Sequence, residues 1–182
     1  MTKPAPSGHI VVLAFAASQA VYVAMLTLTL PTLESLAGGL KPFDMRPGGY
    51  DFMSAQQLLE ALGEGGRAFY LYRQIPLDLI YPGLFALAYY LAWRWLAQRA
   101  WPSWGSLGAF AWLPVCAGLA DYTENGFIAG MIFAYPSVTE GLVTAASTAT
   151  VVKTVLTTMT MIALIFMVIR IAGKRFTARS RR

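Results

Sequence analysis

Two carboxylates and one carboxamide stand close together in a long apolar stretch of the chain. Asp121, Glu124 and Asn125 lie within the run from about residue 107 to residue 135, which is long enough to cross a bilayer. At three- and four-residue steps along a helix, their side chains project from adjoining faces. Because a charged side chain facing lipid costs several kcal/mol, we expect all three to face protein or water.

Two further charged residues, Asp78 and Lys153, are expected at overlapping depths in neighbouring helices. Two nearby carboxyls with a lysine can hold one proton between them as a general acid/base pair, or can bind a cation or a protonated amine. In a catalytic version, Glu124 is the acid/base, Asp121 its partner and Lys153 an electrostatic stabiliser. The candidate ligand-binding residues are Asp78, Asn125, Lys153, Tyr81, Tyr22 and Gln19.

The same residues also fit a structural role. Lys153 either forms an ion pair with Asp78 or Glu124, or extends its ammonium group to the membrane surface. Threonines share its helix face, and such polar stripes are typical of helix packing as well as of pockets. A functional pocket and a structural polar network therefore both remain open. The stripe consists of Thr150, Lys153, Thr154, Thr157 and Thr160.

Pro82 is expected to affect the backbone beside Asp78. Proline has no N–H, so the helical hydrogen bond to the carbonyl of Asp78 cannot form. We therefore expect a free carbonyl beside a carboxylate, which suits a binding site, although prolines are also common in membrane helices.

Composition places the chain in the membrane class. Of its 182 residues, 57% are hydrophobic and only 13% are charged, whereas soluble domains carry about 25% charged residues. A single cysteine, Cys116, excludes an intramolecular disulfide and is expected to be a buried apolar residue. One histidine, His9, argues against a histidine-rich metal or haem site, and we expect no metal and no cofactor.

The net charge of +5 has a local origin. Six of the fourteen basic residues lie in the last thirteen positions, which favours an anionic membrane surface over nucleic acid as partner. These six are Arg170, Lys174, Arg175, Arg179, Arg181 and Arg182.

The elements that position the polar residues are four apolar runs. We predict an all-α, four-helix transmembrane bundle that forms a single domain over residues 1–182. The predicted spans are residues 9–30, 75–96, 107–135 and 146–171, followed by a basic tail at 172–182. A signal peptide cleaved near Ala37 is the alternative for the first run, but its length favours a retained span.

Residues 31–74 are predicted to form a loop with one short amphipathic helix. A capping box at Ser54–Gln57 starts this helix, Leu58, Leu59 and Leu62 form its apolar face, and Gly63 ends it. The helix either lies on the membrane surface or covers a cavity.

Basic residues predict the orientation. With four spans, the two termini and the 97–105 connection share one side, which collects nine Lys and Arg residues and no Asp or Glu. The opposite side has four basic and six acidic residues. The positive-inside rule therefore makes both termini cytoplasmic.

Three segments together resemble a group of small bacterial inner-membrane proteins with four predicted helices. They are Leu77–Pro82, Leu119–Asn125 and Leu58–Gly63, and the resemblance covers about residues 50 to 165. The resemblance implies the four-helix membrane architecture and adds weight to the carboxylates. It implies no particular reaction.

We expect a protein that binds or modifies a small or lipid-like molecule at this polar cluster. The alternative is an accessory subunit or assembly factor of a larger membrane complex, in which the cluster serves helix packing. The expected partners are membrane lipids, together with a small-molecule ligand or a membrane protein.

Overall fold

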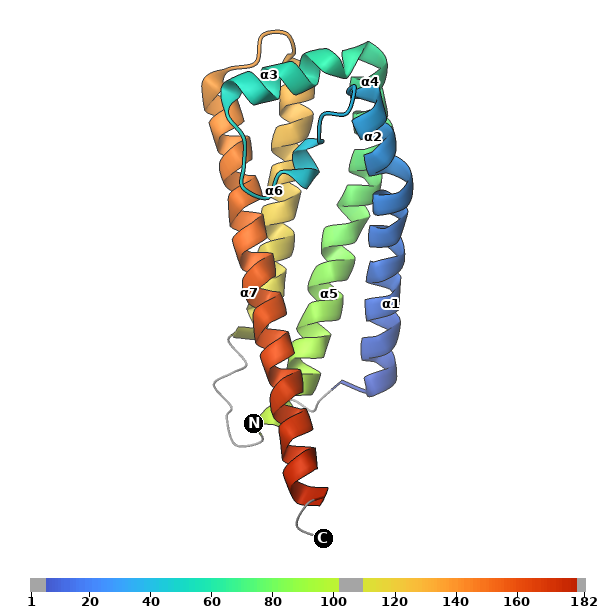
Figure 1. The fold of residues 1–182 in the computed structure, drawn as a ribbon, viewed down its shortest axis with the longest axis vertical. Coiled ribbons are helices and arrows are strands. Elements are labelled where there is room, and N and C mark those ends of the chain that lie inside the picture. Colours follow the sequence, from blue (N-terminus) through green and yellow to red (C-terminus); the bar gives the residue numbers. More distant parts are fainter. Residues whose placement is uncertain (1–5, 102–109, 180–182) are drawn as a thin grey trace.

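The computed structural model describes residues 6–101 and 110–179. Of these described residues 87% are helical, and they form no strand. Figure 1 shows the long helices α1, α5, α6 and α7 side by side, with shorter helices across one end. The elements are α1 (Gly8–Ala24), the π-helical η1 (Met25–Thr29), α2 (Leu30–Leu36), the 3₁₀ turn η2 (Phe43–Met45), α3 (Phe52–Ala61), α4 (Gly63–Phe69), the π-helical η3 (Tyr70–Gln74), α5 (Ile75–Ala100), α6 (Leu113–Ala134) and α7 (Glu140–Arg179).

Three helical stretches are long and apolar enough to cross a membrane. They are Gly8–Leu36, Gly63–Ala100 and Glu140–Lys174, found among the described residues. A helical membrane protein is therefore plausible. The predicted span at 107–135 stays a prediction, because α6 carries Asp121, Glu124 and Asn125 at its centre and its predicted start lies outside the described residues.

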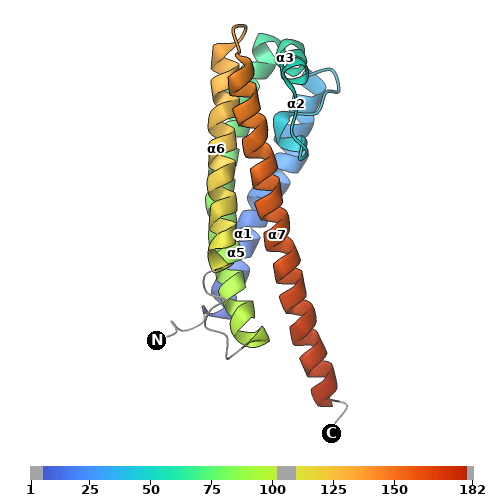
Figure 2. The same cartoon turned by 90° about the vertical axis from the view of Figure 1, so that its left-hand side faces the viewer.

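Helix packing places α5 at the centre of the bundle. α5 contacts α1, α6 and α7, and α6 also contacts α7. At the end that carries α3, α6 and α7 lie together, whereas α7 diverges toward its C-terminus (Figure 2). The contact between α5 and α6 is close at Gly118, where an added Cβ would lie 2.8 Å from the carbonyl oxygen of Pro82.

Two apolar cores lie at different levels of the bundle. The core under α3 includes Leu58, Tyr70 and Ile128, and the second core includes Phe85 and Leu164. On α5 and α6 the polar residues fall between the two levels. The polar cluster is thus enclosed by hydrophobic packing on both sides along the helices.

The segment 31–74 is more helical than predicted. α2 extends the first helix to Leu36, and α4 and η3 lead directly into α5. Pro31 does not end the first helix, because it lies in the first turn of α2, where a missing N–H is tolerated. Gly63 separates α3 from α4 with a positive φ of 59°, but helix resumes at once instead of ending.

The short amphipathic helix exists, but it starts earlier than predicted. Its N-cap is Asp51, whose Oδ1 accepts a 2.7 Å hydrogen bond from the Ser54 amide, so Ser54 lies within the first turn. The buried face of α3 consists of Ala55, Leu58 and Leu59, which belong to the core below it. α3 therefore covers the end of the bundle through apolar packing.

Candidate functional site

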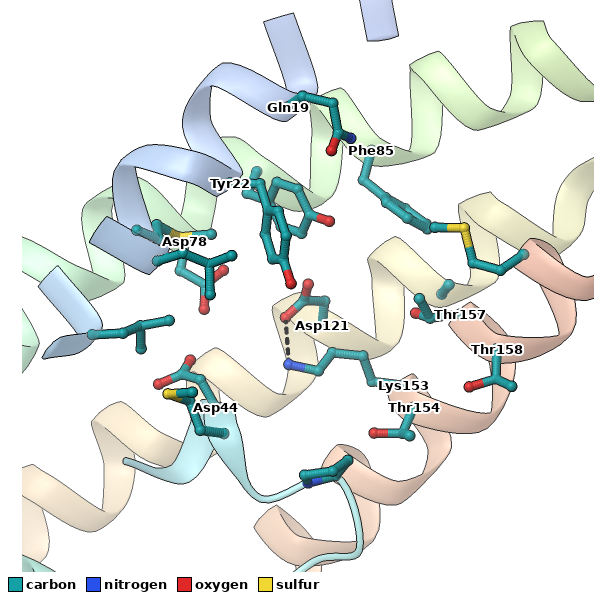
Figure 3. Close-up of a pocket in the computed structure, with 18 of the residues that line it drawn as sticks. Gln19, Tyr22, Asp44, Asp78, Phe85, Asp121, Lys153, Thr154, Thr157 and Thr158 are labelled. Atoms are coloured by element: carbon teal, nitrogen blue, oxygen red, sulfur yellow. Dashed lines mark hydrogen bonds and ion pairs between the residues drawn. The ribbon is translucent and has the colours of Figure 1, made fainter. Parts of the chain in front are cut away.

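A cavity of about 520 Å³ lies within the bundle. This volume falls in the range of small-molecule sites. Its wall comes from the first helical stretch, from α5, α6 and α7, and from residues of the 44–47 segment (Figure 3). The charged residues of the wall are Asp44, Asp78, Asp121 and Lys153.

Most of the predicted site residues line this cavity. From four separate helices, the fold brings together Gln19, Tyr22, Asp78, Tyr81, Asp121 and Lys153. Glu124 and Asn125 do not line it: both are buried in α6.

Lys153 joins two of the predicted carboxylates. Its Nζ lies 3.3 Å from Oδ1 of Asp121 and forms an ion pair with the carboxylate of Glu124. Thr150 donates a further hydrogen bond to Oε1 of Glu124. Of the partners expected for Lys153, Glu124 is in contact and Asp78 is not, and no described ion pair includes Asp78. Because the Glu124 side chain is fully buried beyond the cavity wall, its contact with the cavity runs through Lys153.

The Asp78 carbonyl, which Pro82 leaves without a helical hydrogen bond, is hydrogen-bonded to another helix. Asn125 Nδ2 donates a 2.8 Å hydrogen bond to the carbonyl oxygen of Asp78. This oxygen is therefore satisfied by α6 and is not left for a ligand. Asn125 supports the position of Asp78 from outside the cavity instead of lining it.

Asp44 is a cavity residue that the sequence analysis missed. It belongs to η2, which the buried Phe43 anchors against Tyr50 and Tyr70 at ring distances of 4.7 and 6.2 Å. Tyr70 donates a hydrogen bond to Oδ2 of Asp44. The apolar Phe43 and Met45 on either side of Asp44 could have indicated that this part of the loop packs against the helices, since large apolar side chains are more often buried than solvated.

The 44–47 segment, and not α3, covers the cavity. Asp44, Met45 and Pro47 line it, whereas no residue of α3 does. A 2.8 Å hydrogen bond from the Tyr50 amide to Oγ of Ser147 ties the end of this segment to α7. Burial raises the pKa of the Tyr50 phenol, which stays protonated at neutral pH.

Two π-helical segments border the cavity from different helices. Met25 of η1 and Gln74 of η3 both line it, and Thr29 donates a hydrogen bond to Oε1 of the buried Gln74. Neither Gln74 nor the π-helical turns were predicted from the sequence. π-Helical turns occur frequently at functional sites, because they redirect side chains within a helix.

Aromatic rings form one side of the cavity. Tyr22 and Tyr81 are stacked with a centroid distance of 5.4 Å, and Phe85 and Tyr89 are stacked at 4.2 Å. Gln19 Nε2 donates a 3.3 Å hydrogen bond to the Tyr89 hydroxyl.

The threonine stripe of α7 has two roles. Thr154 and Thr157 line the cavity, whereas Thr150 and Thr160 are buried among helices. The hydroxyls of Thr154 and Thr160 also bond to carbonyls one turn earlier in their own helix. The stripe therefore serves both packing and the cavity wall.

The expected burial of Cys116 is wrong. This residue is exposed on α6, while the adjacent Ala117 and Gly118 are buried. An apolar side chain needs no protein cover where the surroundings are lipid.

Comparison with protein-family models, with curated proteins and with solved structures finds no match to this chain.

Proposed function

We propose that this protein is an integral protein of the bacterial inner membrane that binds a small or lipid-like molecule in the cavity. The observation that carries the proposal is the cavity itself: about 520 Å³ with four charged side chains in its wall. Three of them, Asp78, Asp121 and Lys153, belong to the long helices. Charged groups at such positions are expensive, and their usual justification is a site.

The proposed topology has four spans and both termini in the cytoplasm. α6 is the additional span. Its polar centre supports this assignment, because Asp121, Glu124 and Asn125 are all buried against other helices and none has to face lipid. The basic residues at one end of the bundle support the orientation.

The polar residues have two proposed roles. Asp44, Asp78, Asp121 and Lys153 contact the ligand. Glu124 and Asn125 hold Lys153 and Asp78 in place from behind. If the ligand is also modified, Asp121 is better placed than Glu124 to exchange a proton with it, because Asp121 lines the cavity.

The test is mass spectrometry of small molecules that co-purify with the protein from native membranes. Wild type is compared with Asp78→Asn/Asp121→Asn and with Glu60→Gln, which neutralises an exposed carboxylate on α3. We expect a molecule that accompanies wild type and Glu60→Gln and is lost from the double variant. If no small molecule accompanies wild type, and one membrane protein is recovered equally with all three, the accessory-subunit function replaces this one.

A further inference from the structure

We infer that the ligand of the cavity is a protonated amine with an apolar tail. This inference rests on the proposed function and names the chemical class that the site takes. It follows from the two acidic side chains in the cavity wall that have no cationic partner in the described part of the chain, from the aromatic residues of the wall, and from the separation of a charged end from an uncharged end.

The positive charge of Lys153 is already paired with carboxylates of the chain. Its ammonium group contacts Asp121 and Glu124 together, and the Lys153 side chain is only 18% exposed. No Lys, Arg or His among the described residues forms an ion pair with Asp44 or Asp78. The cavity therefore holds two acidic groups for which the chain itself supplies no cation.

Asp78 is the decisive residue. It is 4% exposed and lines the cavity. Its carboxyl points toward the carboxyl of Asp44 (Figure 3). Oδ1 of Asp44 is itself buried without a hydrogen-bond partner. Two facing carboxyls are satisfied either by one shared proton or by a cation that donates to both.

An ammonium group can donate hydrogen bonds to both carboxyls. Its N–H bonds can reach both carboxyls, and charge-assisted hydrogen bonds of this kind are among the stronger polar contacts. The stacked rings of Tyr22 and Tyr81 lie in the same wall, and aromatic faces attract cations. A carboxylate or phosphate ligand would instead meet three acidic side chains.

Among the residues that the structure describes, the far end of the cavity carries no charged side chain, and aromatic and apolar residues form much of its wall. Along α5, Phe85 and Tyr89 line it two and three turns beyond Asp78, and Met161 lines it two turns beyond Lys153 on α7. Leu26 and Thr158, also in the wall, are exposed to the surroundings of the bundle or to the cavity mouth. An alkyl chain therefore fits beyond the ammonium group, and the site suits a molecule that enters from the membrane.

The experiment measures binding of three matched ligands to the full-length protein in lipid nanodiscs. The ligands are decylamine, decanol and decanoate, which share one chain length and differ in head-group charge. Empty nanodiscs correct for partition into lipid. We expect decylamine to bind wild type at least about tenfold more tightly than decanol, since one ionic hydrogen bond contributes that much. Decanoate should bind most weakly.

Two variants locate the preference. Asp78→Asn should reduce decylamine affinity at least about tenfold and leave decanol affinity unchanged. Glu64→Gln, which neutralises an exposed carboxylate on α4, should leave both affinities unchanged. The wild-type comparison of amine with alcohol needs no variant, so it holds even if Asp78→Asn folds poorly.

The outcomes distinguish failure of the amine assignment from failure of the proposed function. Equal or tighter binding of decanol or decanoate overturns the amine assignment and keeps a ligand site. Binding of none of the three ligands, combined with no co-purifying small molecule, overturns the proposed function itself. A decylamine preference that survives in Asp78→Asn places the cation elsewhere and overturns the inference.

Discussion

Asn125 donates the hydrogen bond that Pro82 cannot, and its Nδ2 lies 2.8 Å from the carbonyl oxygen of Asp78. This single contact joins α5 to α6 at the level of the cavity. It replaces a helical bond lost to proline with a bond between helices. The backbone that carries Asp78 is thereby held by a side chain that itself lies outside the cavity.

Removing this donor should destabilise the bundle. Asn125→Leu keeps a similar side-chain volume but leaves the buried Asp78 carbonyl without a partner, which costs about 1 to 3 kcal/mol. The measurement is the free energy of unfolding in mixed micelles titrated with denaturing detergent. Unchanged stability would mean that the contact contributes nothing to the fold.

The group around Lys153 should behave as a coupled unit. Lys153→Met leaves Asp121 and the fully buried Glu124 without their cation, and breaking a buried pair costs about 3 to 5 kcal/mol. The double variant Lys153→Met/Glu124→Gln should recover part of that loss, because one buried charge is removed with its partner. A double-mutant cycle measures the coupling, and simple additivity would show that the two side chains act independently.

Close contact between α5 and α6 should depend on Gly118. In Gly118→Ala the added methyl group would lie 2.8 Å from the Pro82 carbonyl oxygen and 3.2 Å from Cβ of Ala86, so the helices must separate. Overpacking of this kind costs about 1 to 3 kcal/mol.

Gly126→Ala is the matched control on the same helix, because nothing lies within 4 Å of its added Cβ. It should be neutral or slightly stabilising, since alanine favours helix more than glycine does. Equal effects of the two substitutions would argue against the close approach at Gly118.

Asp51 should make the stability of α3 depend on pH. Hydrogen bonding with Ser54 lowers the pKa of the Asp51 carboxyl below its usual value. A lowered folded-state pKa gives stability that is complete above the unfolded-state value of about 4 and is lost as the pH falls through the folded-state value.

The variant that tests this is Asp51→Asn, which keeps a good N-cap residue without the titration. Its stability relative to wild type should be lower at pH 7 than at pH 3, where the wild-type carboxylate is becoming protonated. The difference between the two proteins cancels the titration of all other groups. If the difference in unfolding free energy between Asp51→Asn and wild type is the same at both pH values, the charge of Asp51 does not stabilise this helix.

Cysteine labelling tests whether α6 spans the membrane. The exposed Cys116 is first replaced in Cys116→Ala. In that background, Ser137→Cys, after α6, should react with a membrane-impermeant thiol reagent in intact cells. Gln98→Cys, near the end of α5, should react only after the cells are permeabilised. If both positions are reached from the same side, α6 does not cross; if the pattern is reversed, the orientation is wrong.

Sequence alone was sufficient for the long helices and for much of the polar site, but not for all of the short helices of residues 31–74. Apolar runs of about 20 residues leave few options other than long helices. The high cost of charged groups in such runs marked Asp78, Asp121 and Lys153 as inward-facing residues. These inferences are local, because they depend on helical periodicity and on the free energy of placing a charge in an apolar medium.

Tertiary structure decided which of these residues share a surface. Glu124 and Asn125 are neighbours of Asp121 on one helix, yet they lie behind the cavity wall, since the rotation of α6 is set by its packing on α5 and α7. Asp44 lies in the wall although its segment has no helical period to reveal it. Its place depends on the packing of Phe43 against Tyr50 and against Tyr70, which comes from the start of the helical stretch that leads into α5. Contacts of that kind arise only when the helices assemble, so spacing along the chain cannot specify them.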